Sequence, residues 1–283
     1  MIEAEDQGCV YFRFEGLKDA PEVAHAVFTR LGGHSQPPFD ELNLSASTGD
    51  DPEIVRRNRA IASATLGLPL VSAKPVHGGE VVIIDRDLTG STHEDGWHER
   101  LRDRLRFIEA DAMVTDIPGV ALFWAYGDCS PILIYDPAHH AIALAHAGWR
   151  GAAAAVTRNT LRAMARRYGT RPEEVLASIG PSIGACCYQV DDRVLASFAA
   201  SPLGAGTEVI EWRTDERGVP RAYLDVPLTS EAQLLAEGVL RERIELSGFC
   251  TGCGPDLFYS NRKGPRHGGR FGVAIGLREV RDG

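Results

Sequence analysis

The chain has 283 residues, of which 44% are hydrophobic and 24% are charged, so it is long enough and apolar enough to bury a substantial core. Its 30 basic and 39 acidic residues give a net charge of −9, which argues against general nucleic-acid binding but allows a local basic pocket for a small anion. No segment approaches the roughly 20 apolar residues of a membrane helix, and the N-terminus lacks the features of a signal peptide. We therefore expect a cytoplasmic protein that contacts no membrane and whose six cysteines are thiols or metal ligands.

The first third of the chain alternates short apolar runs with turn-rich segments. "CVYFRFEGL" and "VAHAVFTRLGG" are typical of strands, whereas "SQPPFDELNLS" is typical of a loop because proline and aspartate favour turns. Residues 50–67 are expected to form a helix, with acidic residues and Pro52 near its start and Gly67 at its end. "EVVIIDRD" indicates another strand, and the polar residues 88–107 indicate an excursion over the surface.

Residues 110–148 contain the densest strand signals, in the apolar runs "ADAMVTD", "GVALFWAYGD", "SPILIYD" and "AIALAHAG". A helix is expected from about Arg150 to Tyr168, since its apolar residues recur at helical spacing. The remaining predicted elements are a short helix and strand in 171–180, helices in 191–200 and 229–240, and a strand from Phe271. Because strands and helices do not alternate strictly, the pattern favours an α+β fold formed by one domain over residues 1–283.

Three candidate metal ligands stand at the ends of apolar runs: His77, Cys129 and His146. Two histidines and one cysteine are a plausible zinc set, and three protein ligands leave a fourth tetrahedral position open for water or substrate. The three residues are 52 and 17 positions apart, so no short metal motif is present. The spacing alone also allows hydrogen-bonded structural histidines, or a Cys-His nucleophile pair that Asp128 orients.

The order of several motifs resembles the YfiH family, also called the laccase-domain or multicopper polyphenol oxidoreductase family. The motifs are "HAVFTRLGGHS", "LNLS", "VHG", "ADAMVTD", "GDCSPIL", "HAGWRG", "IGPSIGACCYQV", "YLDV" and "NRK…GGR", and they extend over residues 25–278. "HAGWRG" and "GDCSP" together are highly specific. The chain departs from the family pattern at Gly127, where alanine is usual, and at Gln189, where glutamate is usual, so substrate preference is open.

The resemblance implies a fold like the catalytic domain of a bacterial cytotoxic necrotizing factor, with mixed β-sheets in a sandwich core and flanking helices. It implies a mononuclear Zn²⁺ held by His77, Cys129 and His146, which together with Asp128 are the candidate catalytic residues. It also implies phosphorolysis of purine nucleosides (adenosine, inosine, guanosine and methylthioadenosine) with adenosine deamination alongside. The expected partners are therefore a purine nucleoside and phosphate, bound by a monomer or small homo-oligomer.

Phosphorolysis requires a cationic pocket that holds phosphate against ribose C1′, and guanidinium groups bind phosphate in a bidentate manner. The candidates are Arg30, Arg59, Arg150, Arg262 and Arg270. Arg150 also opens a predicted helix, whose free N–H groups favour an anion. Asn43 is a candidate for binding ribose or for closing its own loop, and Asp128 for orienting a ligand or accepting a proton.

Three other functions compete with a zinc phosphorylase. A copper polyphenol oxidase would use His77, Cys129 and His146 for one copper at most, since several copper centres need more clustered histidines. A cysteine-dependent amidase that edits peptidoglycan precursors would use Cys129 as nucleophile, and a metal-stabilised binding module would have no turnover.

"CTGC" at 250–253 has redox spacing without the expected strand-to-helix turn, and the pair at 186–187 is expected to include one buried thiol.

Overall fold

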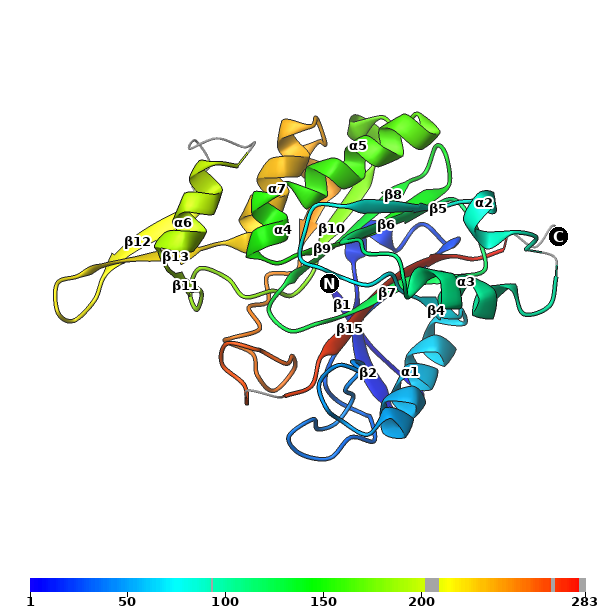
Figure 1. Cartoon of the computed structure of the whole chain (residues 1–283), viewed down its shortest axis with the longest axis horizontal. Helices are drawn as coiled ribbons and strands as arrows, with labels where there is room; N and C mark the ends of the chain where they lie inside the picture. The colour runs from blue at the N-terminus through cyan, green and yellow to red at the C-terminus, as the bar shows by residue number, and fades with distance from the viewer. Residues whose placement is uncertain (93, 202–208, 266–267, 280–283) are drawn as a thin grey trace.

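The structure, a computed structural model, describes residues 1–92, 94–201, 209–265 and 268–279. Two six-stranded mixed sheets form its centre, and a small third sheet projects to one side (Figure 1). In order across the first sheet, the strands are β1 (Ile2–Asp6), β2 (Cys9–Arg13), β3 (Val23–Phe28), β15 (Phe271–Leu277), β7 (Ala121–Tyr126) and β4 (Leu70–Val71). Across the second sheet, they are β14 (Ile244–Leu246), β10 (Leu176–Ile179), β8 (Ser130–Asp136), β9 (Ala141–Ala147), β6 (Ala112–Thr115) and β5 (Val81–Ile84). The third sheet contains β11 (Gln189–Val190), β13 (Pro220–Leu224) and β12 (Ile210–Thr214).

The two large sheets pack face to face, and helices cover their outer faces, as Figure 1 shows. Helix α1 (Pro52–Leu66) packs on the first sheet, while α4 (Trp149–Ala153), α5 (Val156–Tyr168) and α7 (Val226–Ala236) pack on the second. The other helices are α2 (Arg86–Thr89), α3 (Trp97–Leu105) and α6 (Asp192–Ala199), with short 3₁₀ turns at Glu15–Leu17, Pro172–Glu174 and Arg241–Arg243. None of the helices in the described ranges is long and apolar enough to cross a membrane.

Strand β9 shows how the sequence separates the two sides of the second sheet. Successive side chains of a strand point to opposite faces. The alanines of "AIALAHA" therefore lie beneath the covering helices, where small side chains permit close packing. Ile142 and Leu144 point the other way, into the core between the sheets. His146 has the same parity as these two residues, so its ring lies at the edge of the core between the sheets.

The expected fold class is confirmed, and several element boundaries follow from local chemistry. Helix α1 begins after Asp51, whose carboxylate accepts a hydrogen bond from the amide of Glu53, and it ends at Gly67 in the left-handed conformation (φ 69°). The four apolar runs in 110–148 are strands β6 to β9. They are divided between the two large sheets, since β7 belongs to the first sheet and the other three belong to the second.

Two expectations about helices are corrected. The polar excursion over 88–107 contains α3, which buries Trp97, Leu101 and Leu105 along one side of an otherwise charged helix. The single helix predicted from Arg150 to Tyr168 is two helices, because Ala155 adopts a left-handed backbone conformation (φ 59°) between α4 and α5.

Candidate metal centre and its cavity

The structure brings together the side chains of His77, Cys129 and His146 from three separate segments. One donor atom from each residue lies within 4.8 Å of the others. His77 lies in the loop between β4 and β5, Cys129 in the turn from β7 to β8, and His146 near the end of β9. The turn at Cys129 connects β7 of the first sheet to β8 of the second, so the site lies at the edge of the sandwich where the chain crosses from one sheet to the other.

A buried carboxylate, that of Asp111, organises the two histidines. One of its oxygens accepts hydrogen bonds from His146 Nδ1 (3.0 Å) and from the His77 amide (2.9 Å). The other accepts from the amides of Gly78 (2.6 Å) and Val76 (3.2 Å). Because Nδ1 of His146 is engaged, the ring offers Nε2 to the site, which is how carboxylates orient metal-binding histidines in proteins.

Each of the loops that carry His77 and Cys129 contains one non-glycine residue in the left-handed backbone conformation, which is uncommon for residues other than glycine. His77 (φ 61°) and Asp128 (φ 88°) both lie in the left-handed region. Asp111 stabilises the first loop through its contacts with consecutive amides. Asp128 stabilises the second, since its carboxylate accepts from Thr251 Oγ1 (2.7 Å) and from the Arg262 amide (2.6 Å). Both carboxylates therefore hold strained loops in place.

A glycine beside the three donors is required by the close packing. A Cβ added to Gly148 would lie 2.9 Å from Cys129 Sγ and 3.4 Å from His77 Cδ2. Any larger residue at this position would displace the donors. The glycine that follows His146 in "HAGWRG" thus leaves room for the site itself.

The three donors and Asp111 form an electrostatically coupled group. Burial would raise the pKa of the Cys129 thiol, but the imidazoles of His146 and His77 outweigh burial and lower it. Burial would likewise lower the pKa of His146, but Cys129 and Asp111 raise it well above its ordinary value. The thiol is therefore readily ionised, and thiolate is the form in which cysteine binds metals or attacks electrophiles.

The chemistry of this donor set fits a zinc ion. Zinc is bound in proteins by imidazole nitrogen and thiolate sulfur, and catalytic sites leave one position to water or substrate. The residues present supply two nitrogens and one sulfur close together, with the His146 ring oriented by Asp111. His77 is exposed and Cys129 is half-buried, so the fourth side of the group is accessible from solvent.

A cavity of about 290 Å³ opens beside the candidate metal centre. Cys129 and His77 form part of its wall, together with Trp149 and Tyr188. Two predicted phosphate-binding residues, Arg150 and Arg262, also line it. Their guanidinium groups lie over the rings of Trp149 (4.3 Å) and Tyr188 (4.8 Å), respectively.

Neither Arg150 nor Arg262 forms an ion pair with a carboxylate of the described residues. The Arg262 guanidinium donates only to the carbonyl of Gln189 among the described groups. Two cations without paired anions beside one cavity make a suitable binding place for an anion such as phosphate.

Arg270 lies beside Gly127 in the turn that carries Cys129, but nearby protein groups already accept hydrogen bonds from its guanidinium. Its guanidinium donates to the carbonyls of Gly268 and Gly269 and to Oδ1 of Asn261. A Cβ at Gly127 would lie 2.6 Å from Arg270 Cδ. The glycine found at position 127, where the resembled family usually has alanine, therefore accommodates the Arg270 side chain.

The other predicted substrate residues lie outside this cavity. Arg30 donates to the carbonyls of Asp40 and Pro255 and pairs with the Asp40 carboxylate, so it joins two loops. Arg59 donates to the Leu44 carbonyl and lines a different cavity beside α1. The fully buried Asn43 closes its own loop by donating to Ser45, Thr48 and Asp50, and it accepts from the Arg270 amide.

One residue of the site, Asp111, is not among those that the sequence predicts. It stands in the "ADAMVTD" motif directly before β6, and its side chain is fully buried. An acidic residue at the start of an otherwise buried strand is the signal that could have found it, because a buried charge requires partners. Its partners are His146 of β9 and the amides of the loop before β5, and both β9 and β5 pair with β6.

Fold and site together define a two-sheet α+β protein with a His₂Cys candidate metal centre that opens on a cationic cavity. The family described as multi-copper polyphenol oxidoreductase laccase matches residues 24–278, and the chain belongs to this family. It is 34% identical over 270 residues to "Purine nucleoside phosphorylase YlmD" of Geobacillus stearothermophilus, covering 92% of this chain and 93% of that protein. It is 36% identical over 251 residues to "Purine nucleoside phosphorylase SCO2081" of Streptomyces coelicolor, covering 87% and 93%.

Solved structures have the same fold. The crystal structure of YlmD from Geobacillus stearothermophilus superposes with a TM-score of 0.83 at 30% identity, covering 98% of this chain and 99% of that one. The crystal structure of the Bacillus licheniformis hypothetical protein YfiH gives 0.82 at 28% identity, covering 97% and 98%. The expected family resemblance is thus confirmed in sequence and in fold.

Proposed function

We propose that this chain is a zinc-dependent purine nucleoside phosphorylase that also deaminates adenosine. The observation that carries the proposal is the pair of guanidinium groups, Arg150 and Arg262, at the cavity that contains the His₂Cys group. Relatives named purine nucleoside phosphorylase, at 34% and 36% identity, support the same reaction class. Adenosine, inosine, guanosine and methylthioadenosine are the proposed nucleosides.

His77, Cys129 and His146 would hold the zinc ion, and Asp111 would keep His146 in the tautomer that binds it. When bound, zinc supplies a Lewis acid that can lower the pKa of a water molecule to near neutrality, which is the chemistry that deamination at purine C6 requires.

In phosphorolysis an oxygen of hydrogen phosphate attacks ribose C1′, the bond from C1′ to the purine breaks, and the departing base takes up the proton that the phosphate loses. Arg150 and Arg262 would neutralise the phosphate and hold it against the sugar, which removes most of the entropic cost of bringing two reactants together. Trp149 and Tyr188 lie in the same wall and would give the purine an apolar contact surface.

Asp128 acts in this proposal as a positioning residue. Both of its carboxylate oxygens accept hydrogen bonds, from Thr251 and from the Arg262 amide. The Asp128 carbonyl also accepts from Ser182 Oγ (2.7 Å) and the Ile183 amide (3.0 Å). Asp128 thus ties three loops to the turn that carries Cys129, and it leaves proton abstraction to other groups.

The test is release of free base from inosine or adenosine by zinc-loaded protein, with and without phosphate. We expect base and ribose 1-phosphate to appear together and only when phosphate is present, and inosine to form from adenosine. Base release that is independent of phosphate would indicate a nucleosidase, and no release beside an active reference phosphorylase would refute the proposal. The reaction should follow zinc content, not copper content, across preparations.

A multi-copper oxidase has little support in the residues that the structure describes. Only one group of three or more closely spaced donor residues among them contains histidine, and that is His77, Cys129 and His146. One such group can hold one metal ion, whereas multi-copper catalysis needs several histidine-rich centres.

A cysteine hydrolase is favoured by one specific observation. In the protein without metal, Cys129, His146 and Asp111 have the order of nucleophile, base and orienting carboxylate, with Asp111 in the place expected for Asp128. Alkylation with iodoacetamide after metal removal distinguishes the two functions. An amidase would be active without metal and inactivated by alkylation, whereas the phosphorylase would be inactive until zinc is restored.

A further inference from the structure

Four cysteines that take no part in the proposed reaction converge near Tyr188, which lines the cavity. Their sulfur atoms all lie within 4.8 Å of one another, and they belong to Cys186, Cys187, Cys250 and Cys253. Cys253 Sγ lies 3.5 Å from the sulfur atoms of both Cys186 and Cys187. All four are free thiols, and these separations are much longer than the roughly 2.05 Å of a disulfide bond.

The expectation of one buried thiol in the pair at 186–187 is wrong. Cys186 is exposed and Cys187 is half-buried. The sulfur atoms therefore do not serve as packing for the core, which is the common role of a free cysteine.

Tight turns present the four sulfurs to one point. The amides of Cys253 and Gly254 both donate to the carbonyl of Cys250, at 3.1 and 3.0 Å. The amides of Cys187 and Tyr188 both donate to the carbonyl of Gly184, at 2.9 and 3.0 Å. Each turn thus directs two cysteine side chains toward the other turn.

The two turns are closely fitted to each other. The Gly184 amide donates to Cys250 Sγ (3.4 Å), so a hydrogen bond joins the two turns directly. A Cβ at Gly252 would lie 2.9 Å from Cys187 Cβ and 3.0 Å from its sulfur, so only glycine fits between the cysteines of "CTGC". The spacing of two residues within "CTGC" is also the spacing typical of zinc-binding pairs.

We propose that Cys186, Cys187, Cys250 and Cys253 bind a second zinc ion as a closed tetrathiolate site. Four sulfurs at about 2.3 Å from a tetrahedral zinc lie about 3.8 Å from one another, which is close to the observed separations. Four protein ligands leave no position for substrate, so the site is structural. It shares no residue with the His₂Cys group, and the inference does not rest on the proposed reaction.

The proposed tetrathiolate site lies next to residues that shape the cavity. Thr251, between two of the ligands, donates to the Asp128 carboxylate beside Cys129. Tyr188, next to Cys187, lines the cavity. Ser182 and Cys250 form an isolated β-bridge between the same two segments. A zinc ion joining the two turns would fix Tyr188 in the cavity wall relative to Thr251, which holds the Asp128 carboxylate.

The experiment measures zinc per chain in protein purified under reducing conditions without a chelating tag. The variant H77A/C129A removes the His₂Cys group, and we expect it to retain one zinc ion per chain. Adding C187S and C253S should remove that zinc. The matched control adds C9S instead: Cys9 is a buried cysteine of β2 outside both groups, and its loss should leave the zinc in place.

Absence of zinc from H77A/C129A, or retention of zinc after loss of Cys187 and Cys253, would overturn the proposal. If the cysteine variants fail to fold, Co²⁺ substitution of the H77A/C129A protein gives a second measurement. Four thiolates produce intense sulfur-to-cobalt charge-transfer absorption and a tetrahedral visible spectrum. A metal-free chain whose mass shows two disulfides among these four cysteines would instead establish a disulfide pair and refute the zinc site.

Discussion

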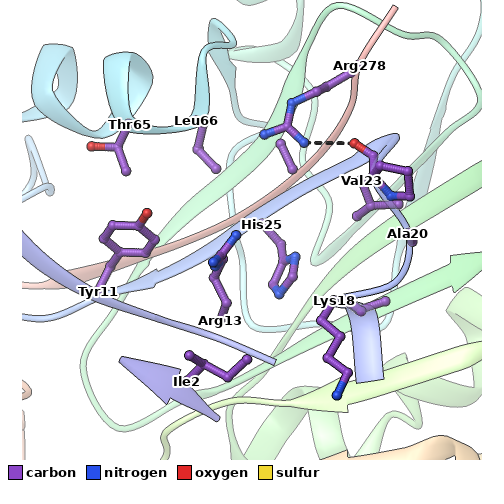
Figure 2. A pocket seen from close by; sticks show the side chains of 13 residues that line it. Ile2, Tyr11, Arg13, Lys18, Ala20, Val23, His25, Thr65, Leu66 and Arg278 are labelled. Atoms are coloured by element: carbon purple, nitrogen blue, oxygen red, sulfur yellow. Dashed lines mark hydrogen bonds between the residues drawn. The ribbon is translucent and has the colours of Figure 1, made fainter. Parts of the chain in front are cut away.

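His146 and His25 are equally buried, each 5% exposed, yet the structure surrounds them with opposite charges. His25 lies on β3, where its Nε2 accepts a hydrogen bond from the Phe14 amide (2.9 Å) and its Nδ1 has no partner in the described part of the chain. It lines a small pocket of about 160 Å³. Figure 2 shows the cationic side chains of Arg13, Lys18 and Arg278 among the residues that line the same pocket.

The two pockets move the histidine pKa in opposite directions. Burial, with a further contribution from Arg13, lowers the pKa of His25 from 6.5 to about 4. At His146 the thiol of Cys129 and the carboxylate of Asp111 overcome the same burial and raise the pKa. Burial alone therefore favours a neutral core histidine, whereas the Cys129 thiol and the Asp111 carboxylate on either side of the His146 ring favour its charged form.

The largest expected difference between the pockets is in activity. H146A removes a proposed zinc ligand and should lower kcat/KM for phosphorolysis on the order of 10³-fold, because metal-based stabilisation of charge in the transition state is lost. H25Q is the matched control, since it replaces an equally buried histidine outside the site and should retain activity close to that of the parent. Steady-state kinetics on both, with folding checked by circular dichroism, make the comparison. Equal losses in the two variants would show that the effect is general destabilisation.

The second prediction concerns stability below neutral pH. Because the folded state depresses the pKa of His25, the unfolded chain binds more protons between pH 6.5 and about 4. The stabilisation is complete above pH 6.5 and is lost as the pH falls toward 4, by about 3 kcal/mol over the interval. H25Q offers an oxygen to the Phe14 amide but does not titrate, so its unfolding free energy should fall less. Urea unfolding of both proteins at several pH values measures this, and parallel pH profiles would contradict it.

The features that could be predicted from the sequence are those whose signal lies in residues that are close together along the chain. His77, Cys129 and His146 lie next to apolar runs, and the flanking motifs select them as candidate ligands without knowledge of the fold. Helix α1 could be predicted for the same reason, since its capping residues Asp51 and Gly67 are adjacent to the helix in the sequence.

The features that the sequence did not predict depend on long-range contacts. The role of Asp111 depends on the parallel pairing of β5 with β6, which brings the loop at 76–78 to its carboxylate. Arg30 and Arg262 are the same residue type in similar loops, but carbonyls and the Asp40 carboxylate occupy Arg30 while Arg262 faces the cavity. No local pattern separates them.

The third prediction tests the carboxylate that distinguishes His146 from His25. D111N keeps the size of the side chain but removes the charge beside Nδ1 of His146 and weakens acceptance from the amides at positions 76–78. We expect zinc affinity at the His₂Cys group to fall by about 10–100-fold. Competition with a chromophoric chelator measures the affinity, in a C187S/C253S background so that only one group is titrated. Unchanged affinity in folded D111N would mean that Asp111 only shapes the loop.

The smallest expected effect concerns the arginines, which both pockets contain. R150M removes one charge-assisted contact to phosphate and should raise the KM for phosphate about tenfold, corresponding to about 1.4 kcal/mol, with a smaller change in the KM for the nucleoside. R13M is the matched control, because it removes an exposed arginine from the His25 pocket and changes net charge equally. If R13M raises the phosphate KM as much as R150M does, the attraction is a property of overall charge. An effect confined to R150M would assign the anion to the cavity beside Cys129, which Arg150 lines together with two of the proposed zinc ligands, His77 and Cys129.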